Sequence, residues 1–206
     1  MNNTTPRRSG RPRKFDELTV VHNATLAFWR RGYDHTSADV LAEATGLGPS
    51  SLYNTFGSKR GLFLAALDHY NDMLADRLAP LTRGREGIAD IDKFLRQLWQ
   101  SRLNASAVPG CLMANTIGEG VDRDARITER TSGYEARIYS AFRSALSRAV
   151  SLGELPSSAP EPLAMVFTSS LVGALVVSRN RADVINEEYT EALMVTLRQW
   201  AGPDVA

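Results

Sequence analysis

The chain has 206 residues, 43% of them apolar, and a formal net charge of +1 at pH 7, so it can bury a substantial core and form one or two small domains. Its single cysteine excludes an intramolecular disulfide framework and points to a reducing compartment. Residues 1–60 hold nine Lys or Arg and five Asp or Glu, and the rest fifteen and eighteen, which indicates a nucleic-acid-binding module joined to a body of another kind.

The first 14 residues combine proline, glycine and serine with basic residues and have no apolar period, which predicts a disordered basic arm over residues 1–14. No apolar segment follows the positive charge, so the arm is not expected to be a signal peptide. Arg11 and Arg13 form a flat basic segment that could lie in a DNA minor groove, where the negative potential attracts arginine. The alternative is a solubilising tail that makes only nonspecific phosphate contacts.

A first helix is expected from Phe15 to Gly32, and the residues from Thr36 to Lys59 then have the spacing of two short helices that cross through a tight turn. Ala42 is small where the second helix passes over the first. Gly46 can adopt the positive φ that ends a helix sharply, and Leu52 points back onto the first helix. A small residue, a glycine and an aliphatic residue at these intervals form a helix-turn-helix signature.

The second helix of this pair presents short or planar hydrogen-bonding side chains, which suit base edges and phosphates in a major groove. Gly48 and Pro49 open it, because proline fits the first helical position. Ser58 begins the next helix and Lys59 lies in its first turn, where a lysine beside free helix amides makes a phosphate clamp. The residues expected to bind DNA are Arg11, Arg13, Thr36, Ser37, Pro49, Ser50, Ser51, Tyr53, Asn54, Thr55, Ser58 and Lys59.

This region resembles the DNA-binding domain of TetR-family transcriptional repressors. The resemblance is carried by Thr36-Ser37, Leu41-Ala42-Glu43-Ala44-Thr45-Gly46, Leu52-Tyr53-Asn54-Thr55-Phe56 and Ser58-Lys59-Arg60-Gly61-Leu62. The chain departs from the family at Gly48, where serine is common, and at Gly61, near which an acidic residue is common. The resemblance implies a helix-turn-helix DNA-binding domain over residues 15–60 and a ligand-binding and dimerisation domain over residues 61–206.

The rest of the chain shows helical periods, no strand alternation and no internal repeat. The helices expected here cover about 58–81, 88–104, 111–120, 125–153, 163–179 and 184–200. A loop over 82–87 and a proline-rich linker over 155–162 separate some of them. The predicted fold is therefore all-α, with about nine helices.

No catalytic, cofactor or metal site is expected, because the three histidines lack metal-ligand spacing and neither a phosphate-binding glycine loop nor a nucleophile elbow is present. Aromatic and methionine residues on inward helix stripes instead suggest a largely apolar effector pocket with a few polar groups, although each could be simple core. The candidates are Phe63, Tyr70, Phe94, Trp99, Arg102, Cys111, Met113, Asn115, Glu119, Tyr134, Phe142 and Phe167.

Cys111 follows Pro109-Gly110 at an expected helix N-terminus, where backbone amides favour a thiolate. The segment from Gly110 to Asn115, with Glu119, is similar to a TetR subgroup in which a cysteine at this place can sense electrophiles or oxidants. The alternative is that Cys111 is a small buried side chain with a packing role.

The helix expected over 163–179 is apolar nearly all round, so in a soluble protein it should be covered on both sides. Its most apolar run is short of the roughly 20 residues that span a bilayer, and no membrane association is expected. The last helix offers a second apolar stripe, and two such helices from each of two chains would make a four-helix interface. The expected interface residues are Leu171, Gly173, Leu175, Tyr189, Leu193 and Leu197.

These features predict a cytoplasmic, homodimeric repressor that binds a palindromic double-stranded DNA operator and is released by a small-molecule effector of unknown identity. It is not expected to be an enzyme. The rival interpretation is a small-molecule binding or sequestering protein whose DNA-binding head does not function. Tyr53, Lys59 and the basic arm favour the repressor, and a steep salt dependence of binding to duplex DNA would distinguish the two.

Overall fold

The computed structural model describes residues 16–103, 108, 110–120, 124–181 and 183–201, and within these residues it contains ten α-helices and no strand. The prediction of an all-α fold is confirmed. The expected basic arm over residues 1–14, with Arg11 and Arg13, lies outside the described residues. The helices are α1 Glu17–Arg31, α2 Ala38–Thr45, α3 Pro49–Phe56, α4 Lys59–Arg77, α5 Ala79–Arg83, α6 Ile88–Arg102, α7 Leu112–Gly118, α8 Ala125–Ser151, α9 Pro160–Val177 and α10 Glu187–Ala201.

The helix expected over 58–81 is two helices, because α4 ends at Arg77 and α5 begins at Ala79. Pro80 explains the break: its ring lacks an amide hydrogen and clashes with the preceding turn inside a continuous helix, but it is tolerated in a first turn. The same tolerance lets Pro160 open α9 earlier than the expected linker allowed. Pro160, which was predicted to belong to a linker, therefore marks a helix start, as Pro80 does.

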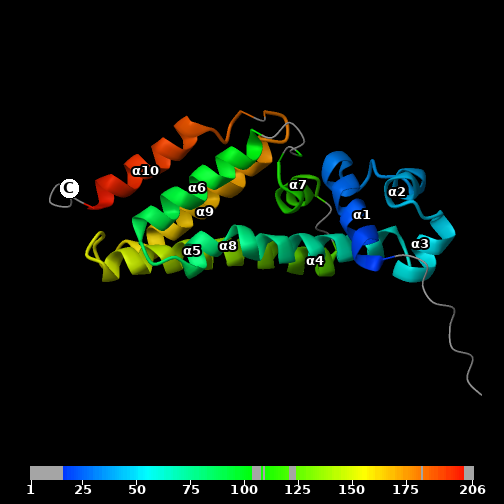
Figure 1. Ribbon diagram of the computed structural model, residues 1–206, viewed down its shortest axis with the longest axis horizontal. Helices are drawn as coiled ribbons and strands as arrows, with labels where there is room; N and C mark the ends of the chain where they lie inside the picture. Colours follow the sequence, from blue (N-terminus) through cyan, green and yellow to red (C-terminus); the bar gives the residue numbers. More distant parts are fainter. Residues whose placement is uncertain (1–15, 104–107, 109, 121–123, 182, 202–206) are drawn as a thin grey trace, which may run out of the picture.

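Figure 1 shows α1, α2 and α3 gathered at one end of an elongated molecule, with α4 leading away from them. The core of this head consists of side chains with no exposed surface, namely Phe28, Leu41, Leu52, Leu62 and Phe63. Two of these belong to the first turns of α4, which also packs along α1. The head core therefore continues past residue 60 into α4.

The other end of the molecule is a bundle, in which the long helix α8 lies beside α4 (Figure 1). Helix α9 packs against α8. Helices α5 and α6 pack on α8, and α10 packs on α6. The short helix α7 contacts α1, α4, α8 and α9, so it lies between the head and the bundle. Helix α7 therefore provides a contact between the head and the bundle in addition to the one that α4 makes.

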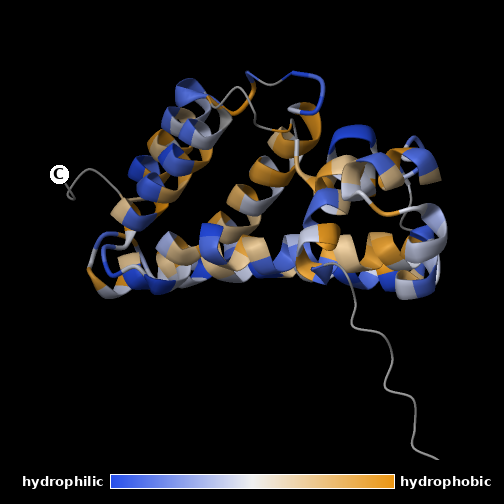
Figure 2. Ribbon diagram, turned by 45° about the vertical axis from the view of Figure 1, so that its right-hand side comes forward, coloured by the Kyte–Doolittle hydropathy of each residue, from blue (hydrophilic) through white to orange (hydrophobic). Residues whose placement is uncertain are grey.

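Helix α9 is apolar along much of its length, as the hydropathy colouring of Figure 2 shows. It is long and apolar enough to cross a membrane by length and composition, with a mean hydropathy of 1.5, but it packs inside the bundle against α7 and α8. One face, with Phe167, is buried, whereas Met165, Val166, Val176 and Val177 on the other face are exposed. Helix α9 was expected to be covered on both faces. Within the described part of this chain, only one of its faces is covered.

This division corrects the expected interface residues. The chain itself buries four of them, namely Leu171, Leu175, Leu193 and Leu197. Tyr189 is half-buried, and its hydroxyl lies 3.3 Å from that of Ser170. Gly173 alone of the expected set is exposed. Leu171 and Leu175 lie on the face of α9 that the bundle covers. A helix that is apolar all round does not reveal from its sequence which face its own bundle covers.

Candidate nucleic-acid interface and effector region

The two short helices α2 and α3 are joined by a turn that its glycines make possible. Gly46 ends α2 in the left-handed region with φ 70°, and its amide donates to the carbonyl of Ala42. Gly48 then caps α3, and Pro49 is its first residue. The helices cross with Leu41 and Leu52 fully buried beneath them, so the turn signature in the sequence produces the expected helix pair.

Helix α3 turns its polar side chains outward. Pro49, Ser50, Ser51 and Asn54 are exposed. Two further members of the predicted set, Tyr53 and Thr55, are half-buried, and the hydroxyl of Thr55 donates to the carbonyl of Ser51 at 3.0 Å. Such a face can enter a DNA groove without exposing the apolar residues beneath it.

The start of α4 lies next to this face. The Ser58 hydroxyl caps α4 by accepting from the amide of Gly61 at 3.0 Å. The Lys59 ammonium lies 4.5 Å from the centre of the Tyr33 ring, which in turn packs against Phe63. This cation–π contact holds the charge at the edge of the head.

Gly61, one of the two departures from the family pattern, is required by local packing. A Cβ at this position would overlap the carbonyl oxygen of Phe56, the last residue of α3. The close approach lets α4 begin directly over the end of α3. Glycine is therefore a steric requirement of this arrangement, although the helix cap next to it does not depend on the side chain at 61.

One predicted DNA contact is wrong. The Thr36 side chain has no exposed surface, and its hydroxyl donates to the carbonyl of Gly32 at 2.6 Å. Ser37, its neighbour, is exposed and caps α2 by accepting from the amide of Val40. A hydroxyl that closes the turn after α1 cannot reach DNA, and the sequence did not show which of the two adjacent residues would face inward.

Charged residues connect the head to the rest of the chain. The Glu119 carboxylate, at the end of α7, accepts from the amide of Tyr33 at 3.1 Å and pairs with Arg179 at the end of α9. A second ion pair joins Arg60 of α4 to Asp124, which caps α8. Glu119 was predicted as an effector-pocket residue; it lies at this junction, where it lines a hollow of about 400 Å³ together with Arg60 and Asp124. Sequence reasoning missed Arg60, Asp124 and Arg179, because ion pairs between residues so distant in sequence leave no local signal.

The single cysteine lies between two tyrosines inside the bundle. The Tyr70 hydroxyl donates to the Cys111 sulfur at 3.2 Å, and the thiol lies 3.0 Å from the Tyr134 hydroxyl. Cys111 is 1% exposed, and burial together with the nearby thiol raises the pKa of Tyr134 well above its usual value. Reactive cysteines are partly exposed and close to positive charge, so this setting favours the packing alternative.

Inside the bundle, the predicted effector residues whose side chains are described do not enclose a large pocket. Tyr70, Phe94 and Tyr134 line a cavity of only about 30 Å³, which has room for a water molecule or two, whereas small-molecule sites occupy roughly 300–1,000 Å³. Phe142 fills the neighbouring space, with its ring against those of Phe94 and Phe167. The interior around the cysteine is therefore packed.

The remaining candidates lie elsewhere. Phe63 belongs to the head core, where it packs against Phe28, so its assignment to the pocket is wrong. Met113 and Asn115 are buried in α7, and neither side-chain atom of Asn115 has a hydrogen-bond partner among the described residues. Trp99 is half-buried, and the side chain of Arg102 lies outside the described structure.

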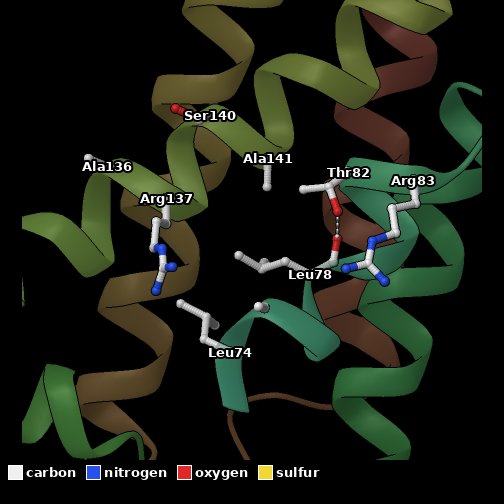
Figure 3. A pocket seen from close by; sticks show the side chains of 9 residues that line it. Leu74, Leu78, Thr82, Arg83, Ala136, Arg137, Ser140 and Ala141 are labelled. Atoms are coloured by element: carbon white, nitrogen blue, oxygen red, sulfur yellow. Dashed lines mark hydrogen bonds between the residues drawn. The ribbon is translucent and has the colours of Figure 1, made fainter. Parts of the chain in front are cut away.

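A larger hollow, which sequence reasoning missed, opens on the outer side of α4, α5 and α8. It has a volume of about 430 Å³, and Figure 3 shows Leu74 and Leu78 on its floor between the side chains of Arg137 and Arg83. We call it the α4–α8 groove. Its residues come from three helices and share no sequence pattern, so only the packing of the helices reveals it.

Comparisons with known proteins agree with this geometry. A family model described as bacterial regulatory proteins, tetR family, matches residues 21–66. The chain is 31% identical over 150 residues to the uncharacterized HTH-type transcriptional regulator YezE of Bacillus subtilis, covering 71% of this chain and 76% of YezE. It is 26% identical over 196 residues to the HTH-type transcriptional repressor ComR of Escherichia coli, covering 93% and 91%.

A solved structure is also similar to most of the chain. It contains a cysteine mutant of the TetR family transcriptional regulator CifR complexed with a 26-base-pair double-strand operator DNA. The similarity covers 93% of this chain and 100% of that one, with a TM-score of 0.79 and 29% sequence identity. The likeness therefore extends over both the head and the bundle.

Proposed function

Since the chain belongs to the TetR family of helix-turn-helix transcriptional regulators, we propose that it is a cytoplasmic repressor that binds a palindromic operator as a homodimer and leaves it when a small-molecule effector binds. The observation that carries the proposal is the exposed polar face of α3 next to Ser58 and Lys59. It belongs to a fold that is similar to CifR complexed with operator DNA. The named relatives are regulators, which fits a protein that is not an enzyme.

In this proposal α3 enters the major groove. Ser50 and Asn54, which are exposed, reach base edges, while Tyr53, Ser58 and Lys59 contact phosphates. We assign the DNA-binding head to residues 15–60 together with the first turns of α4, and effector binding and dimerisation to the remainder up to residue 206. A two-fold dimer would present its two α3 helices to half-sites about one helical turn, roughly 34 Å, apart.

The exposed face of α9 supports the homodimer. Met165, Gly173 and Val176 recur at helical spacing on this face, and a Cβ at Gly173 would meet open space. Val195 and Trp200 add exposed apolar surface on α10. Apolar surface of this kind, rimmed by polar residues, is typical of protein–protein contacts, and a second copy of the chain would cover it.

The effector response requires a link between the bundle and the head. Helix α4 is one link, because its buried side chains pack in the head at one end and in the bundle at the other. The Glu119 carboxylate is a second link, because it joins the ends of α7 and α9 to the backbone of Tyr33. An effector that binds one arrangement of these helices more tightly would favour it, and the spacing of the two heads would change with it.

DNA binding by the full-length chain tests the proposal. Genomic fragments selected by the protein should share a palindrome, and binding to it should weaken steeply as salt rises. Ser50→Ala and Asn54→Ala should each relax discrimination at particular bases by about 1–3 kcal/mol for a lost bidentate contact. Ser132→Ala, at an exposed serine of α8, is the matched control and should change nothing. Failure to select any sequence, with a flat salt dependence, would favour the sequestering protein instead.

A further inference from the structure

The α4–α8 groove has the character of a site for an amphipathic anion. Its floor is apolar, with Leu74 and Leu78 from the end of α4 and Ala141 from α8. Its volume of about 430 Å³ falls within the roughly 300–1,000 Å³ range of small-ligand sites. Two of its described lining residues are arginines and none is acidic, so the groove is apolar at the base and positive at its sides.

The two arginines are placed on opposite sides of that floor. Figure 3 shows Arg137 from α8 on one side and Arg83 from α5 on the other, with Leu78 between them. A hydrogen bond from Arg137 Nη1 to the carbonyl of Asn71 at 3.1 Å holds one guanidinium beside α4. Since a guanidinium carries five N–H donors, Arg137 keeps others for a ligand. The Thr82 hydroxyl already donates to the carbonyl of Leu78 at 3.1 Å.

The groove and the small cavity share two lining residues. Leu74 and Leu78 line both the groove and the cavity of about 30 Å³ that borders Tyr70 and Tyr134. Leu78 is also the residue at which α4 ends and α5 begins. A molecule in the groove would therefore pack against two side chains that also line the cavity next to Tyr70 and Tyr134.

We propose that the α4–α8 groove binds small amphipathic carboxylates, with the apolar body of the ligand on Leu74 and Leu78 and its carboxylate between Arg83 and Arg137. This assignment names the effector class and the site for the response proposed above, and it rests on that proposed function. Guanidinium groups suit carboxylates because they can form paired N–H···O bonds with the two oxygens. A bound molecule would fix the end of α4 against α8, and α4 carries Lys59 at its other end.

Calorimetric titration of the full chain, without DNA, tests the site with octanoate as the probe. Octan-1-ol and octylammonium have the same apolar body without the negative charge, so they should bind more weakly. Arg137→Gln and Arg83→Gln should each weaken octanoate binding by about threefold to fivefold, as expected for exposed ion pairs, and should leave octan-1-ol unchanged. Arg143→Gln is the matched control, because Arg143 is an exposed arginine of α8 that does not line the groove.

A second variant separates the groove from other surfaces. Ala136 is exposed and lines the groove, so Ala136→Trp should fill it without disturbing the core and should abolish the binding of both octanoate and octan-1-ol. Thermal unfolding by circular dichroism confirms that each variant is folded. Equal binding of octanoate and octan-1-ol, an equal loss in Arg143→Gln, or unchanged octanoate binding in Ala136→Trp would overturn the assignment.

Operator binding is measured separately on the same proteins, with and without octanoate. Octanoate should weaken operator binding by the wild-type chain and by Arg143→Gln, and should have no effect on Ala136→Trp. A chain that binds its operator but not octanoate would refute the groove assignment and leave the repressor standing. A chain that binds octanoate in the groove but no DNA would refute the repressor. The two failures are therefore distinguishable.

Discussion

The two ends of α4 lie in opposite surroundings. At the first end, Ser58 and Lys59 are accessible beside the polar face of α3, and the helix closes the small core of the head. At the other end, Leu74 and Leu78 are buried between the α4–α8 groove and the interior cavity. A helix of 19 residues spans roughly 28 Å at 1.5 Å per residue. One rigid element therefore joins a surface suited to phosphates to a hollow suited to an apolar ligand.

The comparison shows why the two ends need different kinds of residue. The DNA-binding end must keep polar groups in water until DNA arrives, so its stability depends on the few fully buried side chains beneath α2 and α3. The bundle end buries many more apolar residues. The truncation of one buried side chain there should therefore disturb the fold less than the same change in the head. Changes of equal size should therefore affect the head and the bundle differently, and this difference can be tested.

The largest effect is expected for the head core. Leu52→Ala removes a fully buried side chain from beneath α3, and such a change costs about 2–5 kcal/mol of unfolding free energy. Because the head core is small, α3 should lose its fixed position, and specific DNA binding should fall below detection. Urea unfolding and fluorescence anisotropy with operator DNA measure the two effects. Ser51→Ala, at the exposed neighbouring position, is the control and should retain the wild-type stability.

A smaller effect is expected at the junction. Glu119→Gln removes the charge that Arg179 and the amide of Tyr33 share, and a hydrogen bond to a charged group contributes about 1.5–3 kcal/mol. The head should be held less firmly, so operator affinity should fall although no DNA contact is changed. A double-mutant cycle with Arg179→Gln should give a coupling energy of about 0.5–3 kcal/mol, since the residues are in contact.

Glu129→Gln on the exposed surface of α8 is the matched control for the junction. If it lowers operator affinity as much as Glu119→Gln does, the effect comes from net charge alone. In that case the contacts of the Glu119 carboxylate play no part in holding the head.

A still smaller effect is expected for Lys59→Ala. Loss of one phosphate contact should flatten the slope of log affinity against log salt by about 0.9, with a similar loss on all sequences. The contact of the ammonium with the Tyr33 ring is also removed, at a cost of about 0.5–1 kcal/mol for an exposed site. Lys93→Ala, an exposed lysine of α6, should leave the slope unchanged. An unaltered slope in Lys59→Ala would exclude Lys59 as a phosphate contact.

The sequence was most informative where structure is local. Ala42, Gly46 and Leu52 encode the helix pair within a few residues, and the glycine adopts the left-handed conformation that the pattern requires. Thr36 was misplaced because two adjacent hydroxyl residues, Thr36 and Ser37, offer the same chemistry. Only the packed turn decides which of them faces inward.

The body was predicted less well because its features arise between distant segments. A stripe of apolar residues predicts that α9 is buried, but not which face its own bundle covers, and Leu171 and Leu175 were assigned to the interface for this reason. Glu119 and Arg179 lie 60 residues apart in the chain. The α4–α8 groove combines residues of three helices with no shared motif. Such features follow from the packing of helices and cannot be read from any single one.

The smallest expected effect concerns the two histidines between α1 and α4. His22 Nδ1 and His69 Nε2 lie 3.2 Å apart. Burial, and then the nearby His22, lower the pKa of His69 below its ordinary 6.5, while Asp72 opposes this. A lowered pKa means that the unfolded chain binds a proton at His69 more readily than the folded chain does. The contribution of neutral His69 to the free energy of unfolding should therefore be fully present above about pH 6.5 and should decrease as the pH falls below that value.

Urea midpoints measured at about pH 7.5 and about pH 5.5 test this sign. His69→Gln removes the titrating group, so its midpoint should decrease less than that of the wild-type chain over the same range. His35→Gln is the matched control, because His35 is exposed in the loop before α2 and should leave the pH dependence as it is in the wild type. A wild-type midpoint that rises on acidification would mean that the two rings are stabilised by protonation, and that the head is held to α4 more firmly in acid than the lowered pKa implies.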